Sequence, residues 1–205
     1  HVMPDYKHNL PPFTQIEVPV PLSAHGRQHY AETAGKFETA GVLAKTAASK
    51  VLKLHQIASG FVYNDDKKAI WIHDDKNTAL EKVLEKIRKM HVTNILIVYQ
   101  FVEELEQLRH RYPDIASLGD GPDIVSDWNA GRLNMLAIHP ASGSHGLNMA
   151  KGGHTIIWLA PRWSLDQHTQ QNERLWRRGQ TEPTTAYILV ATDTVDNLVL
   201  LRHID

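Results

Sequence analysis

The chain of 205 residues contains no cysteine, which excludes disulfide bonds, thiolate nucleophiles and cysteine-ligated zinc. It also lacks any apolar run approaching the roughly 20 residues that span a bilayer. The N-terminal stretch, residues 1–12, has no apolar signal core. We therefore expect a cytoplasmic protein with no membrane contact.

An excess of positive charge is also missing, because the formal net charge is −1. Proteins that bind nucleic acid usually carry a basic footprint, and this chain has none globally. Locally, residues 162–180 contain four arginines against Asp166 and Glu173. The local net charge of this segment is about +2.

The chain divides by pattern into two parts. Residues 1–25 are rich in proline, and Thr14–Val20 alternates like a short edge strand. Two helical patterns follow in residues 27–59, and Gly60 is expected to end the second. We predict a linker with a helical extension over residues 1–68 and one compact lobe over residues 69–205.

The second part alternates between strands and helices. Expected strands are 95–99, 115–118, 134–139, 154–159 and 186–190; expected helices are 80–87, 101–112, 123–129, 164–176 and 195–204. Alternation of this kind implies right-handed crossovers. The prediction is an α/β fold with three layers, in which a parallel sheet is covered by helices on both faces.

Polar segments follow three of these strands, at the edge where open parallel sheets gather their functional loops. They are Gln100, the loop His139–Met149, and the stretch Pro161–Gln180. In the third segment, Ser164 and Gln167 form a capping-box pattern that starts a helix.

On that predicted helix, Gln170, Arg174 and Arg177 share one face. Arginine offers a planar fork of donors that suits phosphate oxygens. The plain alternative is a solvated helix face.

The loop after the 134–139 strand carries Gly143 and Gly146 with Ser142 and Ser144. Glycine lets the backbone approach a ligand closely, and N–H groups and hydroxyls of such a loop can bind phosphate. An ordinary polar turn remains the alternative for this pattern taken alone.

Taken in order, these segments resemble the C-terminal lobe of Swi/Snf-type ATPases of helicase superfamily 2. The resemblance covers most of residues 50–205 and rests on the motifs GLNM (146–149), RWS (162–164) and Q-x-x-x-R-x-x-R-x-G-Q (170–180). The stretches LHQI (54–57) and ILIVYQF (95–101) also resemble the family. The HPAS and WNAG stretches are similar to phage and prophage members.

The resemblance implies a RecA-like fold and roles for individual residues. Arg174 and Arg177 would be arginine fingers, with Gln170 positioning them. Gly146 and Asn148 would lie with the two arginines at the ATP site.

Gln100, Ser142, His145, Arg162 and Trp163 would contact nucleic acid. The expected partner is DNA, with the double-stranded form as the expected substrate.

Three positions depart from the family pattern. Ser142 stands near the place where a threonine often touches a DNA phosphate. Trp176 replaces a histidine, and Trp163-Ser164-Leu165 replaces WNP. The arginine assignments are unaffected by these changes, whereas the DNA contacts are less firmly carried over.

The phosphate-binding motif G-x-x-x-x-G-K-[ST] is absent, and so is a D-E-x-H-like magnesium segment. In the family both belong to a first RecA-like lobe. We therefore expect this chain to be a C-terminal part of a longer protein, with ATP and Mg²⁺ held mainly by that first lobe and with no ATPase activity of its own.

Two other hypotheses remain open. His139, His145, His154 and His168 fall near the same sheet edge, although no H-E-x-x-H pair is present; we predict no metal site. The second hypothesis is a non-catalytic nucleic-acid or protein-interaction module with a degenerate helicase fold. Loss of ATP hydrolysis on replacing Arg174 or Arg177 would separate it from a motor lobe.

Overall fold

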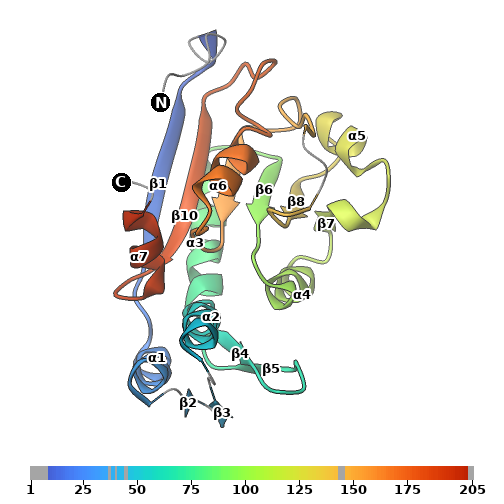
Figure 1. Cartoon of the computed structure of the whole chain (residues 1–205). Helices are drawn as coiled ribbons and strands as arrows, with labels where there is room; N and C mark the ends of the chain where they lie inside the picture. The colour runs from blue at the N-terminus through green and yellow to red at the C-terminus, as the bar shows by residue number, and fades with distance from the viewer. Residues whose placement is uncertain (1–8, 37, 40, 44–45, 143–145, 203–205) are drawn as a thin grey trace. The chain divides into compact units, whose positions relative to one another are not determined.

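The computed structural model describes residues 9–202, apart from residues 37, 40, 44–45 and 143–145 (Figure 1). The chain separates into two compact units. The first contains residues 1–17 and 85–188, and the second contains residues 18–84 and 189–205. This division differs from the boundary predicted after residue 68, because the C-terminal helix groups with the N-terminal helices.

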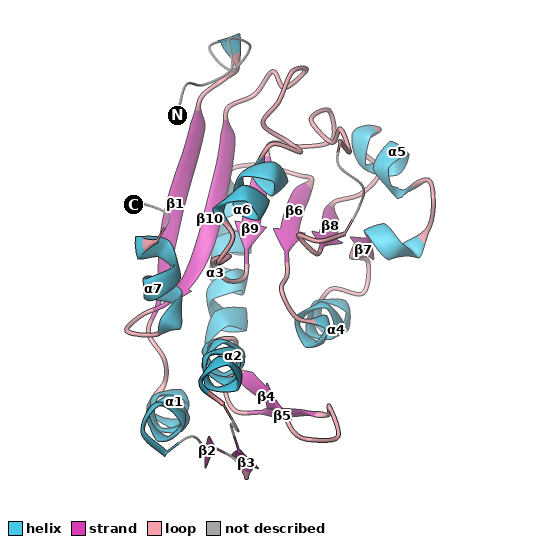
Figure 2. Ribbon diagram, in the orientation of Figure 1, coloured by secondary structure: helices cyan, strands magenta, loops and turns pink. Residues whose placement is uncertain are grey.

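A six-stranded sheet has the order β1-β10-β9-β6-β8-β7 (Figure 2). Its strands are β1 (Phe13–Val20), β6 (Ile95–Val98), β7 (Ala116–Ser117), β8 (Met135–Ile138), β9 (Thr155–Trp158) and β10 (Thr184–Ala191). The pairs from β10 to β7 are parallel. β6, β8 and β9 are apolar and almost wholly buried, as expected for parallel strands covered on both faces.

Helices cover both faces of the sheet in the first unit. Trp158 of β9 is stacked on His168 of α6 (Leu165–Asn172), with ring centroids 4.4 Å apart. Tyr187 of β10 pairs with Ile157, the neighbour of Trp158, so its side chain lies on the opposite face of the sheet from Trp158. Its ring lies 6.0 Å from Lys86 Nζ of α3 (Asp75–Lys89). The remaining helical elements of this unit are α4 (Val102–Arg111), the 3₁₀ turn η2 (Leu118–Asp120) and α5 (Ile124–Asn129). The predicted RecA-like architecture is confirmed.

The second unit is built mainly from helices. It contains α1 (Ala24–Lys36), α2 (Ala47–Ala58), α7 (Val195–Leu201), most of α3, and the short pairs β2 (Glu38–Thr39)–β3 (Val42–Leu43) and β4 (Phe61–Tyr63)–β5 (Ala69–Trp71). Val42, Ile57, Val62 and Ile72 form an apolar cluster within it. Gly60 ends α2 with φ +105°, and a Cβ there would lie 2.4 Å from the His73 carbonyl oxygen. Glycine is therefore required at this turn.

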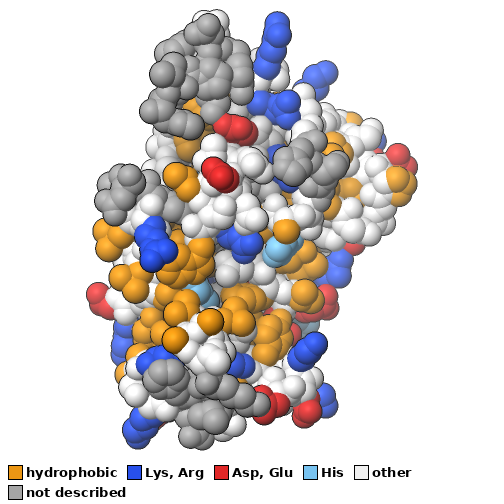
Figure 3. Space-filling view, viewed as in Figure 1, with side chains coloured by type: hydrophobic (Ala, Val, Ile, Leu, Met, Phe, Trp, Pro, Cys, Tyr) orange, Lys and Arg blue, Asp and Glu red, His pale blue; other side chains and the backbone are white. Residues whose placement is uncertain are grey.

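The surface mixes both signs of charge. On the face drawn in Figure 3, Lys and Arg side chains are scattered among Asp, Glu and apolar side chains. This agrees with the net charge of −1. No helix in the described ranges combines the length and apolar character needed to cross a membrane.

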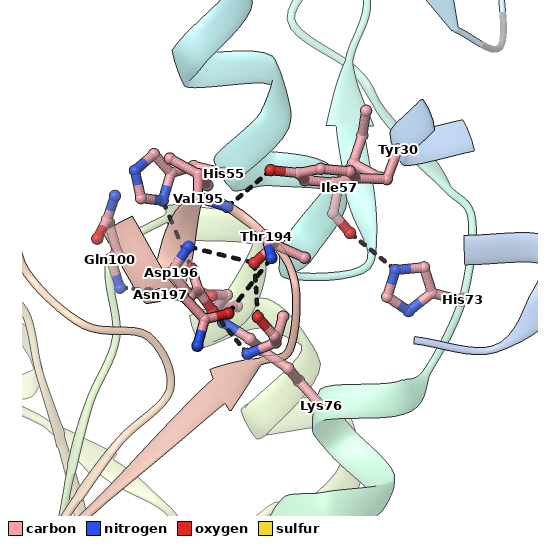
Figure 4. A network of polar contacts seen from close by, with 12 residues as sticks. Tyr30, His55, Ile57, His73, Lys76, Gln100, Thr194, Val195, Asp196 and Asn197 are labelled. Carbon is pink, nitrogen blue, oxygen red and sulfur yellow. Dashed lines mark hydrogen bonds and ion pairs between the residues drawn. The ribbon is translucent and has the colours of Figure 1, made fainter. Parts of the chain in front are cut away.

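A buried polar network ties α2, α3 and α7 together in the second unit (Figure 4). Lys76 Nζ lies 2.7 Å from Asp196 Oδ2, and His55 Nδ1 lies 3.7 Å from Asp196 Oδ1. All three side chains are at most 5% exposed. The Val195 N–H donates to the Tyr30 hydroxyl at 2.7 Å, so α1 joins the same network.

The predicted strands and helices appear in the predicted order, with some bounds shifted and further short strands present. The β2–β3 and β4–β5 hairpins were not predicted. The last strand is longer than expected, since β10 covers Thr184–Ala191. The predicted strand at residues 14–20 lies at the sheet edge as β1, where its proline at position 19 is tolerated.

Candidate functional site

Two of the three predicted loops meet where neighbouring strands end. Gln100 follows β6 and His139 follows β8, and these strands are paired in register. His139 Nε2 lies 3.1 Å from the Gln100 carbonyl oxygen. Burial lowers the pKa of His139, and the nearby Arg162 charge acts in the same direction while the Gln100 contact opposes it. His139 therefore favours its neutral form.

A pocket of about 450 Å³ lies between the loop after β8 and the segment after α6. Its lining residues are Gly146, Leu147, Gln170, Glu173, Arg174, Arg177 and Arg178. Three guanidinium groups thus share one hollow with a single carboxylate. Such a hollow favours an anionic group with several oxygen acceptors.

Arg174 is the most buried of these arginines, at 9% exposed. Its Nη2 donates to the Ser142 carbonyl at 2.9 Å. Its Nη1 is buried and has no hydrogen-bond partner among the described residues. Burial lowers the pKa of this guanidinium, yet arginine stays protonated in proteins. Arg174 therefore brings a buried cation with an unused donor to the lining of this pocket.

Arg177 lies on the same pocket and contacts the glycine-containing loop. Its Nη1 is 3.4 Å from the carbonyl oxygens of both Gly146 and Leu147. Gly146 has φ +110°, a conformation that favours glycine. Within the described chain, neither Arg174 nor Arg177 forms an ion pair with a carboxylate, so both guanidinium charges are available to a ligand.

The predicted helical stripe of Gln170, Arg174 and Arg177 is wrong in its geometry. α6 begins after the N-cap Ser164, which accepts from the Gln167 N–H as predicted, but it ends at Asn172. The two arginines lie in the tight turns that follow.

The turns after α6 are held by hydrogen bonds from Met149 and Gln180. The Arg174 carbonyl accepts from the Met149 N–H, and the Leu175 carbonyl accepts from the Gln180 amide. Gln170 on the helix and the two arginines in the turns all line one pocket.

The other predicted site residues are not among the described residues that line this pocket. Ser142 contacts Arg174 through its carbonyl, and Asn148 is exposed, with its carbonyl bound by the Asn129 amide at 2.7 Å. Arg162 donates to Gln167 Oε1 at 2.7 Å, and burial lowers its pKa. Trp163 is 36% exposed.

His145, also predicted as a DNA contact, lies outside the described residues. In the described ranges, no three side chains of His, Cys, Asp or Glu come close enough together to hold a metal ion.

Several residues that shape the pocket were not predicted. Glu173 and Arg178 line it, and both are adjacent to arginines that the motif had identified. Gln180 was part of the motif without a role. Its amide nitrogen donates to the carbonyls of Ala150, Gly153 and Leu175 at 3.0–3.2 Å, which holds the end of the arginine segment.

Comparison with known proteins gives relatives along most of the chain, although no family model matches it. Putative protein p41 of Acyrthosiphon pisum secondary endosymbiont phage 1 is 34% identical over 203 residues, which is 96% of this chain and 43% of that protein. The DNA repair and recombination protein RAD54B of Homo sapiens is 27% identical over 142 residues, which is 63% of this chain. The chromatin-remodeling ATPase INO80 of Mycosarcoma maydis is 24% identical over 140 residues.

The chain spans less than half of each of these relatives, down to 16% of RAD54B and 7% of INO80. Among solved structures, the C-terminal part of the Fun30 ATPase domain has a TM-score of 0.69 at 15% identity. That comparison covers 94% of this chain and 89% of the other, which establishes a shared fold.

Proposed function

We propose that this chain is the second motor lobe of an ATP-dependent DNA helicase or translocase, because it is similar in sequence and fold to the C-terminal region of Swi/Snf-type ATPases. In this proposal Arg174 and Arg177 are arginine fingers that meet a nucleotide carried by a first RecA-like lobe of the same protein. The proposed nucleotide site also includes Gln170, Gly146 and Asn148.

The observation that carries the proposal is the unused donor of Arg174. Leaving a buried donor of a charged group without a partner costs about 1–3 kcal/mol or more. Arg174 Nη1 is in that state, and its Nη2 is fixed by the Ser142 carbonyl. A phosphate oxygen arriving at the pocket would satisfy the free N–H, so the cost within the lobe becomes binding energy for an anion.

The arginines that line the pocket suit the terminal phosphates of ATP. Arg174, Arg177 and Arg178 supply positive charge around one pocket. Bound ATP supplies the phosphoryl group whose transfer to water develops negative charge that a guanidinium neutralises. Carboxylate ligands for Mg²⁺ are not clustered in the described part of this chain, and we assign the ion to the first lobe.

DNA is the polymer that we propose this lobe grips. Gln100 and Ser142, with the half-buried Arg162 and exposed Trp163, lie on loops that follow strands β6, β8 and β9. Backbone and side-chain donors of this kind bind phosphates without reading sequence. We propose a DNA contact for His145 as well, because it follows Ser142 closely in the sequence.

The test uses the complete protein that contains this chain. Arg174→Ala and Arg177→Ala should each reduce DNA-stimulated ATP hydrolysis by about 10³-fold or more, in line with the usual contribution of an arginine finger. DNA affinity should stay within about twofold. Arg174→Lys should also fail, because an ammonium cannot replace the guanidinium fork.

The matched control is Arg88→Ala, which removes an exposed arginine outside the pocket. It should leave hydrolysis unchanged. Normal hydrolysis by both Arg174→Ala and Arg177→Ala would contradict the proposal and favour a non-catalytic interaction module instead.

A further inference from the structure

Two consecutive side chains at the end of α5 hold two consecutive carbonyls of the loop after β8. The Trp128 Nε1–H donates to the Met149 carbonyl at 2.9 Å. The Asn129 amide donates to the Asn148 carbonyl at 2.7 Å. Trp128 is fully buried, so the first of these bonds is shielded from water.

The same short segment contacts the arginines on its other side. The Met149 N–H donates to the Arg174 carbonyl at 3.0 Å. Arg177 Nη1 contacts the Leu147 carbonyl, one residue before Asn148, at 3.4 Å. The Asn148–Met149 segment is thus bonded to α5 through its carbonyls and to the arginine segment through an N–H and a neighbouring carbonyl.

We propose that Trp128 and Asn129 are positioning residues for the two arginines and act through Asn148–Met149. This inference rests on the proposed function, since it assigns to α5 the control of where the guanidinium groups stand. Displacements of about 1 Å at a reacting group, caused from outside the site, can slow a reaction about 100-fold. Releasing the carbonyls of Asn148 and Met149 would allow the arginine segment bonded to them to shift by such a distance.

Packing alone does not account for these two residues. A phenyl ring would fill space beside Gly152, where an added Cβ would lie 2.2 Å from Trp128 Cδ1 and Nε1. Tryptophan adds the N–H that the Met149 carbonyl uses. Asn129 Oδ1 is buried without a partner among the described residues, so the bond from its Nδ2 is the interaction that orients this side chain.

The test compares Asn129→Ala and Trp128→Phe with Ser126→Ala, an exposed change on the same helix, in the complete protein. Asn129→Ala should lower kcat about tenfold while KM for ATP and DNA affinity change less than twofold. Trp128→Phe should act in the same direction. Ser126→Ala should match the wild type.

Amide hydrogen exchange without nucleotide supplies a readout that does not depend on hydrolysis. In Asn129→Ala the Met149 amide should exchange at least several-fold faster. The Leu159 amide, which donates to the Val98 carbonyl at 3.0 Å in the sheet, should keep its rate. A change at both amides would mean general destabilisation and would overturn the assignment.

The two proposals fail in distinguishable ways. If Arg174→Ala abolishes hydrolysis while Asn129→Ala and Trp128→Phe keep normal kcat, the positioning role is rejected and the motor function stands. An unchanged Met149 amide also rejects the positioning role. If Arg174→Ala and Arg177→Ala both hydrolyse ATP normally, the motor function is rejected, and the positioning role falls with it.

Discussion

At the scale of single residues, one charged side chain is buried in a place where it does not stabilise the fold. Arg174 is 9% exposed and its Nη1 has no described partner. Strained or unsatisfied groups persist when the surrounding structure holds them, and they often mark sites where a ligand acts. Stability and function should therefore respond in opposite ways to substitution at this position.

Arg174→Met is expected to leave the free energy of unfolding unchanged or to raise it by about 1 kcal/mol. The variant loses the bond from Nη2 to the Ser142 carbonyl, and it no longer buries an incompletely paired charge. Urea unfolding measures the difference. Arg132→Met, at an exposed pair with Asp127, serves as the control and should change stability by less than about 1 kcal/mol. A loss above about 2 kcal/mol for Arg174→Met would show that the charge is well satisfied in the folded chain.

His73 should make the stability of the second unit depend on pH. Burial lowers the pKa of His73, while Asp75 and the Ile57 carbonyl partly oppose the shift. The folded protein thus holds this proton less tightly than the unfolded chain does. The stabilising contribution is complete above the ordinary histidine pKa of about 6.5 and is lost as the pH falls through the lower folded value.

The measurement is the urea midpoint of wild type and His73→Gln at several pH values from 7.5 to 5. The wild type should lose more stability on acidification than the variant. An equal loss in both proteins would remove His73 as the source, and a smaller loss in the wild type would reverse the sign of its contribution.

At the scale of elements, hydrogen bonds and ion pairs between elements decide how these are joined. The segment after α6 is held by Met149 and Gln180, which donate to the carbonyls of Arg174 and Leu175. In the second unit, Asp196 in the first turn of α7 has no solvent exposure and accepts from the Ala191 N–H at 3.0 Å. Lys76 of α3 supplies the opposing charge.

Lys76→Met should destabilise the protein by about 3–5 kcal/mol, because Asp196 would remain as a buried charge without its cation. Lys76→Met combined with Asp196→Asn should recover much of that loss. Thermal and urea unfolding of both variants measure the effect. Lys82→Met, an exposed change on α3, should be close to neutral. A double variant that is less stable than Lys76→Met would indicate that the Asp196 carboxylate is needed for its other bonds.

At the scale of the whole molecule, the mixed surface charge fits a lobe that does not bind DNA strongly alone. The formal net charge is −1, and the arginines of the pocket face one hollow instead of a broad basic surface. Affinity for a polyanion depends mainly on the number of phosphates neutralised. We expect most of the DNA grip, and the phosphate-binding loop, to come from the proposed first lobe.

The isolated chain should therefore show no DNA-stimulated ATP hydrolysis, while the complete protein should show it. Phosphate-release assays with and without DNA compare the two. Restored hydrolysis on adding the first lobe in trans would strengthen the assignment. Ordinary turnover by the isolated chain would contradict it, because nothing in its sequence matches the loop that cradles the nucleotide phosphates.

Much of this architecture could be predicted from the order of the residues. Short apolar runs such as Ile95–Val98 favour buried strands, and a parallel sheet follows once helical patterns separate them. The pattern of Gln170, Arg174 and Arg177 pointed to three residues that line one pocket, and their role there stays a prediction. These features depend on periodicity and on chemistry within a few positions, so sequence by itself determined them.

The tertiary structure alone decided where the side chains stand. In the folded chain, α6 ends before the arginines, and Gly146 and Leu147 line the same pocket as they do. Trp128 and Asn129 bind the carbonyls of Met149 and Asn148. The bonds that Trp128, Asn129 and Arg177 form with this loop join groups that lie 19 to 31 residues apart. Local propensity carries no information on such partners, because they are chosen only when the sheet brings the loops together.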